Sequence, residues 1–114
     1  MDLSDSIPSF PPHVLVVEID GAKARTFRSF YPRIAKVLLF PDYFGNNLDA
    51  LNDCLCSLEV LGNTDIVLLI RNARELLSKE KKEKKEALLQ VFRDAEKSEN
   101  RYDGVKFRVV GVKG

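Results

Sequence analysis

Two short apolar runs place the tightest limit on how this chain can fold. His13–Ile19 is rich in β-branched residues and ends at Asp20-Gly21, and Ile66–Ile70 is apolar throughout. Runs of this length without alternation are typical of strands that are buried on both faces, as in a parallel sheet. Both are much shorter than the roughly 20 residues that a membrane-spanning helix needs. We therefore expect a chain that neither crosses nor binds the membrane.

Apolar residues at helical spacing separate these runs and predict an alternation of strands and helices. Ser29 is a suitable N-cap for the first helix, with Pro32 in its first turn. The expected helices cover about 29–38, 47–57, 73–77 and 79–95, and a last strand covers 105–110. We predict an α/β fold in which a three-stranded parallel sheet packs with about four helices through right-handed crossovers.

The first residues differ from the rest of the chain. Residues 1–12 contain three prolines and have no hydrophobic period, so we expect a poorly ordered leader followed by one domain over residues 13–114. The chain has 114 residues and is 45% hydrophobic, which is enough for one core. Its two cysteines do not suggest a disulfide framework, and no signal segment is recognisable, so we expect a cytoplasmic protein.

Charge is distributed unevenly along the chain. Residues 37–70 carry five acidic residues and no lysine or arginine. The net charge of this segment is therefore −5, although that of the whole chain is +1. The five are Asp42, Asp49, Asp53, Glu59 and Asp65. An acidic surface is expected here, and its natural complement is a basic partner or a basic active-site cleft.

The residues do not predict an enzyme, a metal site or a cofactor. His13 is the sole histidine, which leaves little room for a Ser/His/Asp or Cys/His arrangement. Cys54 and Cys56 lie two positions apart on a helix and point to different faces, so they suit neither a shared metal nor a disulfide. Asp49 and Asp53 lie four apart on one helix face. A small enzyme that uses them as an acid/base pair stays an alternative, as does a merely solvated helix face.

The segment around these two aspartates resembles a known family. Leu39–Leu55 has the sequence LFPDYFGNNLDALNDCL and is similar to the signature of the barstar family, Pro-acid-Tyr-aromatic-Gly-polar-Asn-Leu-Asp-Ala-Leu-Trp-Asp-Cys-Leu. Leu89–Ala95, LQVFRDA, resembles a second segment near the end of that family's last helix. The similarity runs from about Val14 to Val110. It implies a barstar-like fold and a non-enzymatic inhibitor of a bacterial ribonuclease or RNase-type toxin.

The resemblance also implies roles for individual positions. Asp49 and Asp53 match two helix aspartates that enter the basic nuclease cleft as phosphate mimics. Tyr43 matches a tyrosine that stacks near the catalytic histidine of the nuclease, and Asp94 matches a glutamate in a peripheral ion pair. The interface residues expected from this match are Tyr43, Phe44, Gly45, Asn47, Asp49, Asn52, Asp53, Cys56 and Asp94. Asn47 has a second interpretation as the N-cap of its helix.

Three positions depart from the family pattern. Asn52 and Leu58 stand where the family has tryptophan, and Cys56 stands where it has threonine. Because aromatic anchors often carry interface energy, these departures predict a target other than barnase, or a weaker complex with it.

The expected partner is a basic ribonuclease or RNase-like toxin, bound one to one by a chain that is a monomer when free. Two other functions stay open besides the small enzyme. One is an immunity protein that uses the same surface against a toxin of different chemistry. The other is a nucleic-acid binder that uses the lysine-rich run at Lys79–Lys85, although the acidic residues interleaved there favour a solvated helix start and no direct nucleic-acid binding.

Overall fold

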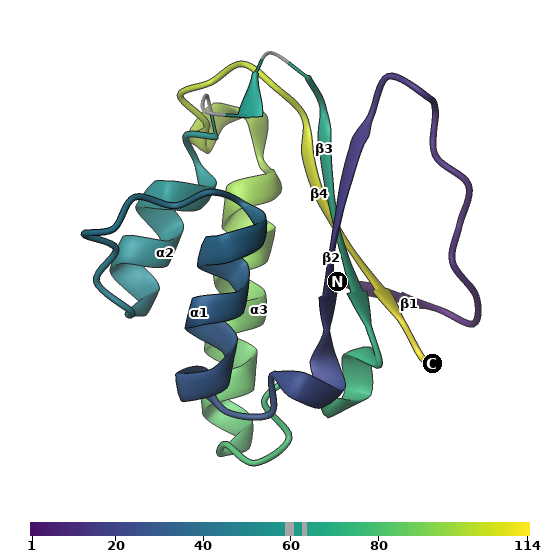
Figure 1. The fold of residues 1–114 in the computed structure, drawn as a ribbon, viewed down its shortest axis with the longest axis vertical. Helices are drawn as coiled ribbons and strands as arrows, with labels where there is room; N and C mark the ends of the chain where they lie inside the picture. Colours follow the sequence, from purple (N-terminus) through teal and green to yellow (C-terminus); the bar gives the residue numbers. More distant parts are fainter. Residues whose placement is uncertain (59–60, 63) are drawn as a thin grey trace.

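The structure is a computed structural model that describes residues 1–58, 61–62 and 64–114, and it forms one parallel sheet with helices (Figure 1). The described strands are β1 (Asp2–Ser4), β2 (Leu15–Asp20), β3 (Ile66–Arg71) and β4 (Phe107–Val112), and the α-helices are α1 (Phe27–Val37), α2 (Leu48–Leu55) and α3 (Lys82–Glu96). The strand order is β1-β4-β3-β2, and every neighbouring pair is parallel. The predicted α/β class with a parallel sheet is confirmed.

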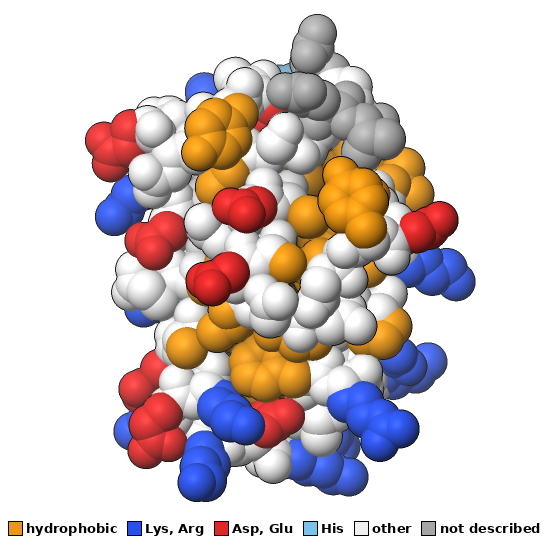
Figure 2. Space-filling model, turned by 90° about the vertical axis from the view of Figure 1, so that its left-hand side faces the viewer, with side chains coloured by type: hydrophobic (Ala, Val, Ile, Leu, Met, Phe, Trp, Pro, Cys, Tyr) orange, Lys and Arg blue, Asp and Glu red, His pale blue; other side chains and the backbone are white. Residues whose placement is uncertain are grey.

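The three helices lie on one face of the sheet (Figure 1). Ile66, Leu68 and Ile70 of β3 contribute to the main core beneath them. Val67 and Leu69 belong to a smaller apolar cluster on the opposite face. Burial on both faces explains why this strand is apolar from Ile66 to Ile70. Figure 2 shows the outer side of the helical layer, where acidic and hydrophobic side chains mix on the upper half and lysines and arginines gather toward the lower end.

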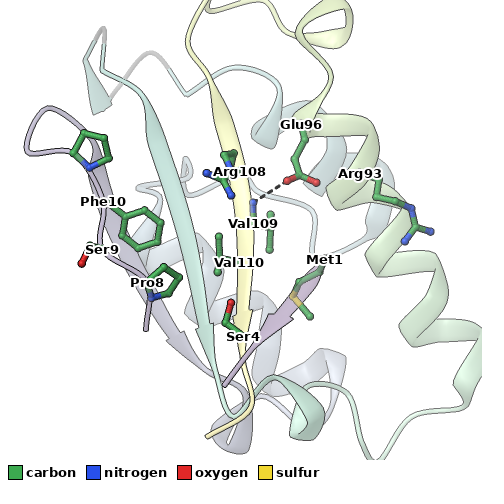
Figure 3. A pocket seen from close by; sticks show the side chains of 11 residues that line it. Met1, Ser4, Pro8, Ser9, Phe10, Arg93, Glu96, Arg108, Val109 and Val110 are labelled. Carbon is green, nitrogen blue, oxygen red and sulfur yellow. Dashed lines mark hydrogen bonds between the residues drawn. The ribbon is translucent and has the colours of Figure 1, made fainter. Parts of the chain in front are cut away.

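The N-terminal segment covers part of the other face of the sheet. β1 pairs with β4, with Asp2 opposite Val110, and Phe10 packs with Val14 against the smaller cluster. Figure 3 shows Phe10 and Met1 on opposite sides of a hollow of about 480 Å³ beside β4. β1 makes the described sheet four-stranded, where the sequence predicts three strands. A strand of three residues in a proline-rich segment has no detectable period, and it forms because the edge of β4 supplies its hydrogen-bond partners.

α1 begins earlier than the sequence predicts. Thr26 is its N-cap, and the Thr26 hydroxyl accepts a hydrogen bond from the Ser29 N–H at 3.2 Å. The Ser29 hydroxyl in turn accepts one from the Thr26 N–H at 3.3 Å, which completes a capping box. Ser29, the predicted N-cap, is therefore inside the helix, and Pro32 lies beyond the first turn.

The helix predicted after β3 is a single 3-10 turn, Ala73–Glu75, and α3 begins later than the predicted Lys79. The Leu77 N–H donates to the Ala24 carbonyl at 2.9 Å, and the Lys79 N–H donates to the Arg25 carbonyl at 3.0 Å. Because these donors bond to the segment before α1, they are not available to continue a helix. The described residues thus contain three α-helices, where the sequence predicts about four. None of them combines the length and apolar character needed to span a bilayer.

Candidate functional site

The loop from α1 to α2 starts with a defined helix end. Leu39 has a φ of 53°. The Phe40 N–H donates to the Ala35 carbonyl at 2.9 Å, and the Leu39 N–H donates to the Lys36 carbonyl at 3.4 Å. These two bonds form a Schellman motif, which ends a helix at a residue of left-handed conformation. The turn redirects the chain into the loop that carries Tyr43.

Two adjacent aromatic residues of this loop have opposite environments. The ring of Phe44 is half-buried, with its centroid 5.8 Å from that of Tyr31 and 5.0 Å from that of Phe40. Tyr43 is 87% exposed. Phe44, which the sequence predicts for the interface, therefore packs against α1, whereas Tyr43 is open to solvent.

Asn47 forms the start of α2. Its Oδ1 accepts a hydrogen bond from the Ala50 N–H at 2.8 Å, and its Nδ2 donates to the Gly45 carbonyl at 3.0 Å. The N-cap interpretation of Asn47 is confirmed. A Cβ at Gly45 would lie 3.0 Å from Asn47 Nδ2, so the glycine leaves room for the capping amide. Both residues therefore shape the beginning of the acidic helix.

α2 presents its carboxylates to solvent. Leu51 and Leu55 are fully buried and set the inner face of the helix. Asp49 and Asp53 are exposed on the outer face, and within the described residues neither carboxylate has an ion-pair partner. Glu59, another acidic residue of the predicted acidic segment, lies outside the described residues. We call Asp49 and Asp53 together the acidic ridge.

A hollow lies on each side of the acidic ridge. The polar hollow, of about 420 Å³, is lined by Leu48, Asp49, Asn52, Val91, Asp94 and Asn100. The apolar hollow, of about 380 Å³, is lined by Leu38, Leu39, Phe40, Pro41, Tyr43, Cys54, Ser57 and Leu58. Successive helical residues are about 100° apart around the axis, which places Asn52 and Cys54 on opposite flanks of the ridge. The sequence does not predict the apolar hollow.

Asp94 reaches this site from α3. It lines the polar hollow together with Asp49 and Asn52, so the structure brings these three predicted residues together. Its carboxylate accepts a hydrogen bond from Gln90 Nε2 at 2.9 Å and lies 3.8 Å from Lys97 Nζ. The charge of Asp94 is therefore partly compensated within the chain itself.

A family model described as Barstar (barnase inhibitor) matches residues 14–111. This chain belongs to the Barstar family. Barstar proteins are ribonuclease inhibitors rather than enzymes, and they bind barnase-type ribonucleases. The resemblance noted in the sequence is confirmed.

Of the two cysteines in this Barstar chain, Cys56 lies beneath the acidic ridge and Cys54 lies beside it. Cys56 is 3% exposed, so its side chain belongs to the core and not to the surface for which the sequence predicts it. Cys54 is half-buried at the apolar hollow. Burial raises the pKa of both thiols, and Asp53 raises the pKa of Cys54 further. In the part of the chain that the structure describes, no group of histidine, cysteine and acidic residues could hold a metal ion.

The Barstar fold of this chain also contains a buried ion pair behind α2. Arg101 and Asp103 are each 1% exposed at the side chain, and Asp103 Oδ2 accepts a hydrogen bond from the Leu58 N–H at 2.9 Å. Burial by itself raises the pKa of Asp103, but hydrogen bonds from Arg101, Leu58 and Val105 outweigh it and hold the pKa below its usual value. The sequence does not predict this ion pair, because no local pattern shows that these two charges become buried.

Proposed function

We propose that this Barstar chain inhibits a basic ribonuclease or RNase-type toxin, one to one, by placing α2 and its preceding loop in the active-site cleft. The acidic ridge carries this proposal. Asp49 and Asp53 are exposed on one helix face, and Tyr43 beside them is 87% exposed. A cleft that binds RNA presents cations to phosphate groups, and carboxylates spaced by about one helical turn complement such cations.

The rigidity of α2 supports the same role. Asn47 caps the helix, and the buried Leu51 and Leu55 attach it to the core. Carboxylates that are already in place lose little conformational freedom on binding, and their charge accelerates the encounter with a basic partner. In this proposal the free inhibitor is a monomer that acts in the cytoplasm, where a toxic ribonuclease meets its RNA substrate.

The test is a titration of the chain against a panel of small basic microbial ribonucleases, with RNA cleavage and calorimetric binding measured in parallel. We expect stoichiometric inhibition of at least one ribonuclease, and roughly 30-fold or greater weakening by Asp53→Asn, which removes a charge at nearly constant shape. Glu18→Gln is the matched control. Glu18 is an exposed carboxylate on β2, and its substitution removes one negative charge, as Asp53→Asn does.

Salt dependence gives a second readout. The association rate should fall as ionic strength rises, because attraction between exposed charges is screened. Equal binding by wild type and a folded Asp53→Asn variant would contradict the proposed use of the ridge. Inhibition of a toxin of different chemistry, together with no inhibition of any ribonuclease in the panel, would instead favour the immunity-protein alternative.

A further inference from the structure

Leu39 occupies a position that is unusual for a leucine. It follows the C-cap of α1 in the Schellman motif and has a φ of 53°. Glycine is usual there, because left-handed backbone brings a Cβ close to the following carbonyl oxygen. The Leu39 side chain is nevertheless 56% exposed and lines the apolar hollow. One residue thus combines backbone strain with apolar exposure.

Leu77 provides a comparison within the same chain. Its φ is 54°, nearly the same as that of Leu39. Its side chain, however, is only 1% exposed and belongs to the main core. Burial of an apolar side chain offsets the strain at Leu77. Leu39 gains much less burial in the free chain, and strained residues of this kind tend to occur at functional sites.

The apolar hollow lies next to the acidic ridge on α2. Cys54 follows Asp53 on α2 and lines the hollow, and Tyr43 lines it from the loop. Leu58, where the family pattern has tryptophan, also lines it, so a smaller side chain stands where a large ring is usual. The remaining space, about 380 Å³, has room for one aliphatic or aromatic side chain.

We propose that the apolar hollow receives a large apolar or aromatic side chain of the same ribonuclease, next to the cations that meet Asp49 and Asp53. This inference rests on the proposed function. Insertion buries Leu39 and Tyr43 and supplies an anchor in a chain that lacks the family's tryptophans. The hollow therefore selects, among ribonucleases with a basic cleft, those that carry an apolar side chain at the rim of that cleft.

Two variants test the hollow with a ribonuclease that the titration identifies. Ser57→Trp fills it from an exposed wall, and Leu39→Asn removes an apolar wall with a residue that tolerates left-handed backbone. We expect each to speed dissociation roughly tenfold without changing the salt dependence of association. Leu39→Asn should also keep or raise the Tm, because it relieves strain.

Two matched controls make comparable substitutions away from the apolar hollow. Ser78→Trp and Ile7→Asn alter exposed residues outside the hollow and should leave dissociation unchanged. Unchanged dissociation in both hollow variants, with Asp53→Asn still weakening binding, would overturn this inference and leave the proposed function standing. Loss of the Asp53→Asn effect would overturn the proposed function itself. If Leu39→Asn lowers the Tm, the test rests on Ser57→Trp alone. An unchanged dissociation rate of Ser57→Trp would then overturn the inference.

Discussion

The Asp103 carboxylate accepts a hydrogen bond from the Leu58 N–H at 2.9 Å and also forms an ion pair with Arg101 in the interior. Arg101 Nη1 also donates to the Ala95 carbonyl of α3 at 2.8 Å. The pair therefore ties the chain that leaves α2 to the end of α3. In the proposed function, the carboxylates of α2 depend on such support, although neither member of the pair is at the surface.

Asp103→Ala tests this support. The change leaves the Arg101 guanidinium buried without its counter-ion, and we expect the free energy of unfolding to fall by about 3–5 kcal/mol. Urea denaturation measures it. Glu75→Ala breaks the Arg25–Glu75 pair, whose side chains are 44% and 43% exposed, and should cost less than about 1 kcal/mol. Similar losses in the two variants would contradict a special role for the buried pair.

Asp103 also makes stability depend on pH. Its pKa is lower in the folded chain than in the unfolded chain, so its contribution is complete above the ordinary carboxyl pKa of about 4 and is lost as pH falls through the lower folded value. We expect the free energy of unfolding to decrease with falling pH below about 4. The decrease should be smaller in Asp103→Asn, as measured by urea denaturation across an acid pH series. An equal decrease in the free energy of unfolding for wild type and Asp103→Asn would show that Asp103 does not cause this pH dependence.

Asp53 should contribute more to inhibition than Asp94. Within the described residues the Asp53 carboxylate has no ion-pair partner, whereas Asp94 already contacts Gln90 and Lys97. We expect Asp53→Ala to weaken binding at least about tenfold more than Asp94→Ala does. Calorimetry with the same ribonuclease gives both dissociation constants, and equal losses would contradict this ranking.

Asn47 is expected to act mainly as a helix cap. Asn47→Ala removes the acceptor for the Ala50 N–H and should lower the free energy of unfolding by about 1 kcal/mol. Asn47→Asp keeps an acceptor oxygen and should keep both stability and inhibition. Thermal unfolding and inhibition assays on both variants separate the roles. Poor inhibition by a stable Asn47→Asp variant would point instead to a direct contact with the partner.

Phe10 should stabilise the fold without affecting inhibition. It packs against the apolar cluster on the face of the sheet away from the helices. Phe10→Ala should therefore lower the free energy of unfolding by about 1–2 kcal/mol, while Ile7→Ala, at a more exposed apolar residue of the same segment, should cost less. Chemical denaturation and ribonuclease inhibition are the measurements. No stability loss in Phe10→Ala would show that the segment does not support the sheet.

The sequence by itself determines the α/β class, the parallel strands and the position of the acidic helix. These features follow from local patterns. The continuous apolar run of β3 reflects burial on two faces, and the spacing of Leu51 and Leu55 defines one buried helix face. Cap chemistry is local too, so Asn47 could be predicted as an N-cap. The charge of the segment from 37 to 70 likewise predicts an acidic surface before any contact is known.

Only the tertiary structure decides where segments distant in sequence meet. The Leu77 N–H bonds to Ala24 instead of continuing a helix, and Leu58 bonds to a buried carboxylate far along the chain. It also decides that Cys56 is buried and that Leu39 stays half exposed at a hollow. Local patterns specify which residues are apolar, charged or able to cap. They do not specify which distant donor meets which acceptor, because that depends on how the helices pack against the sheet.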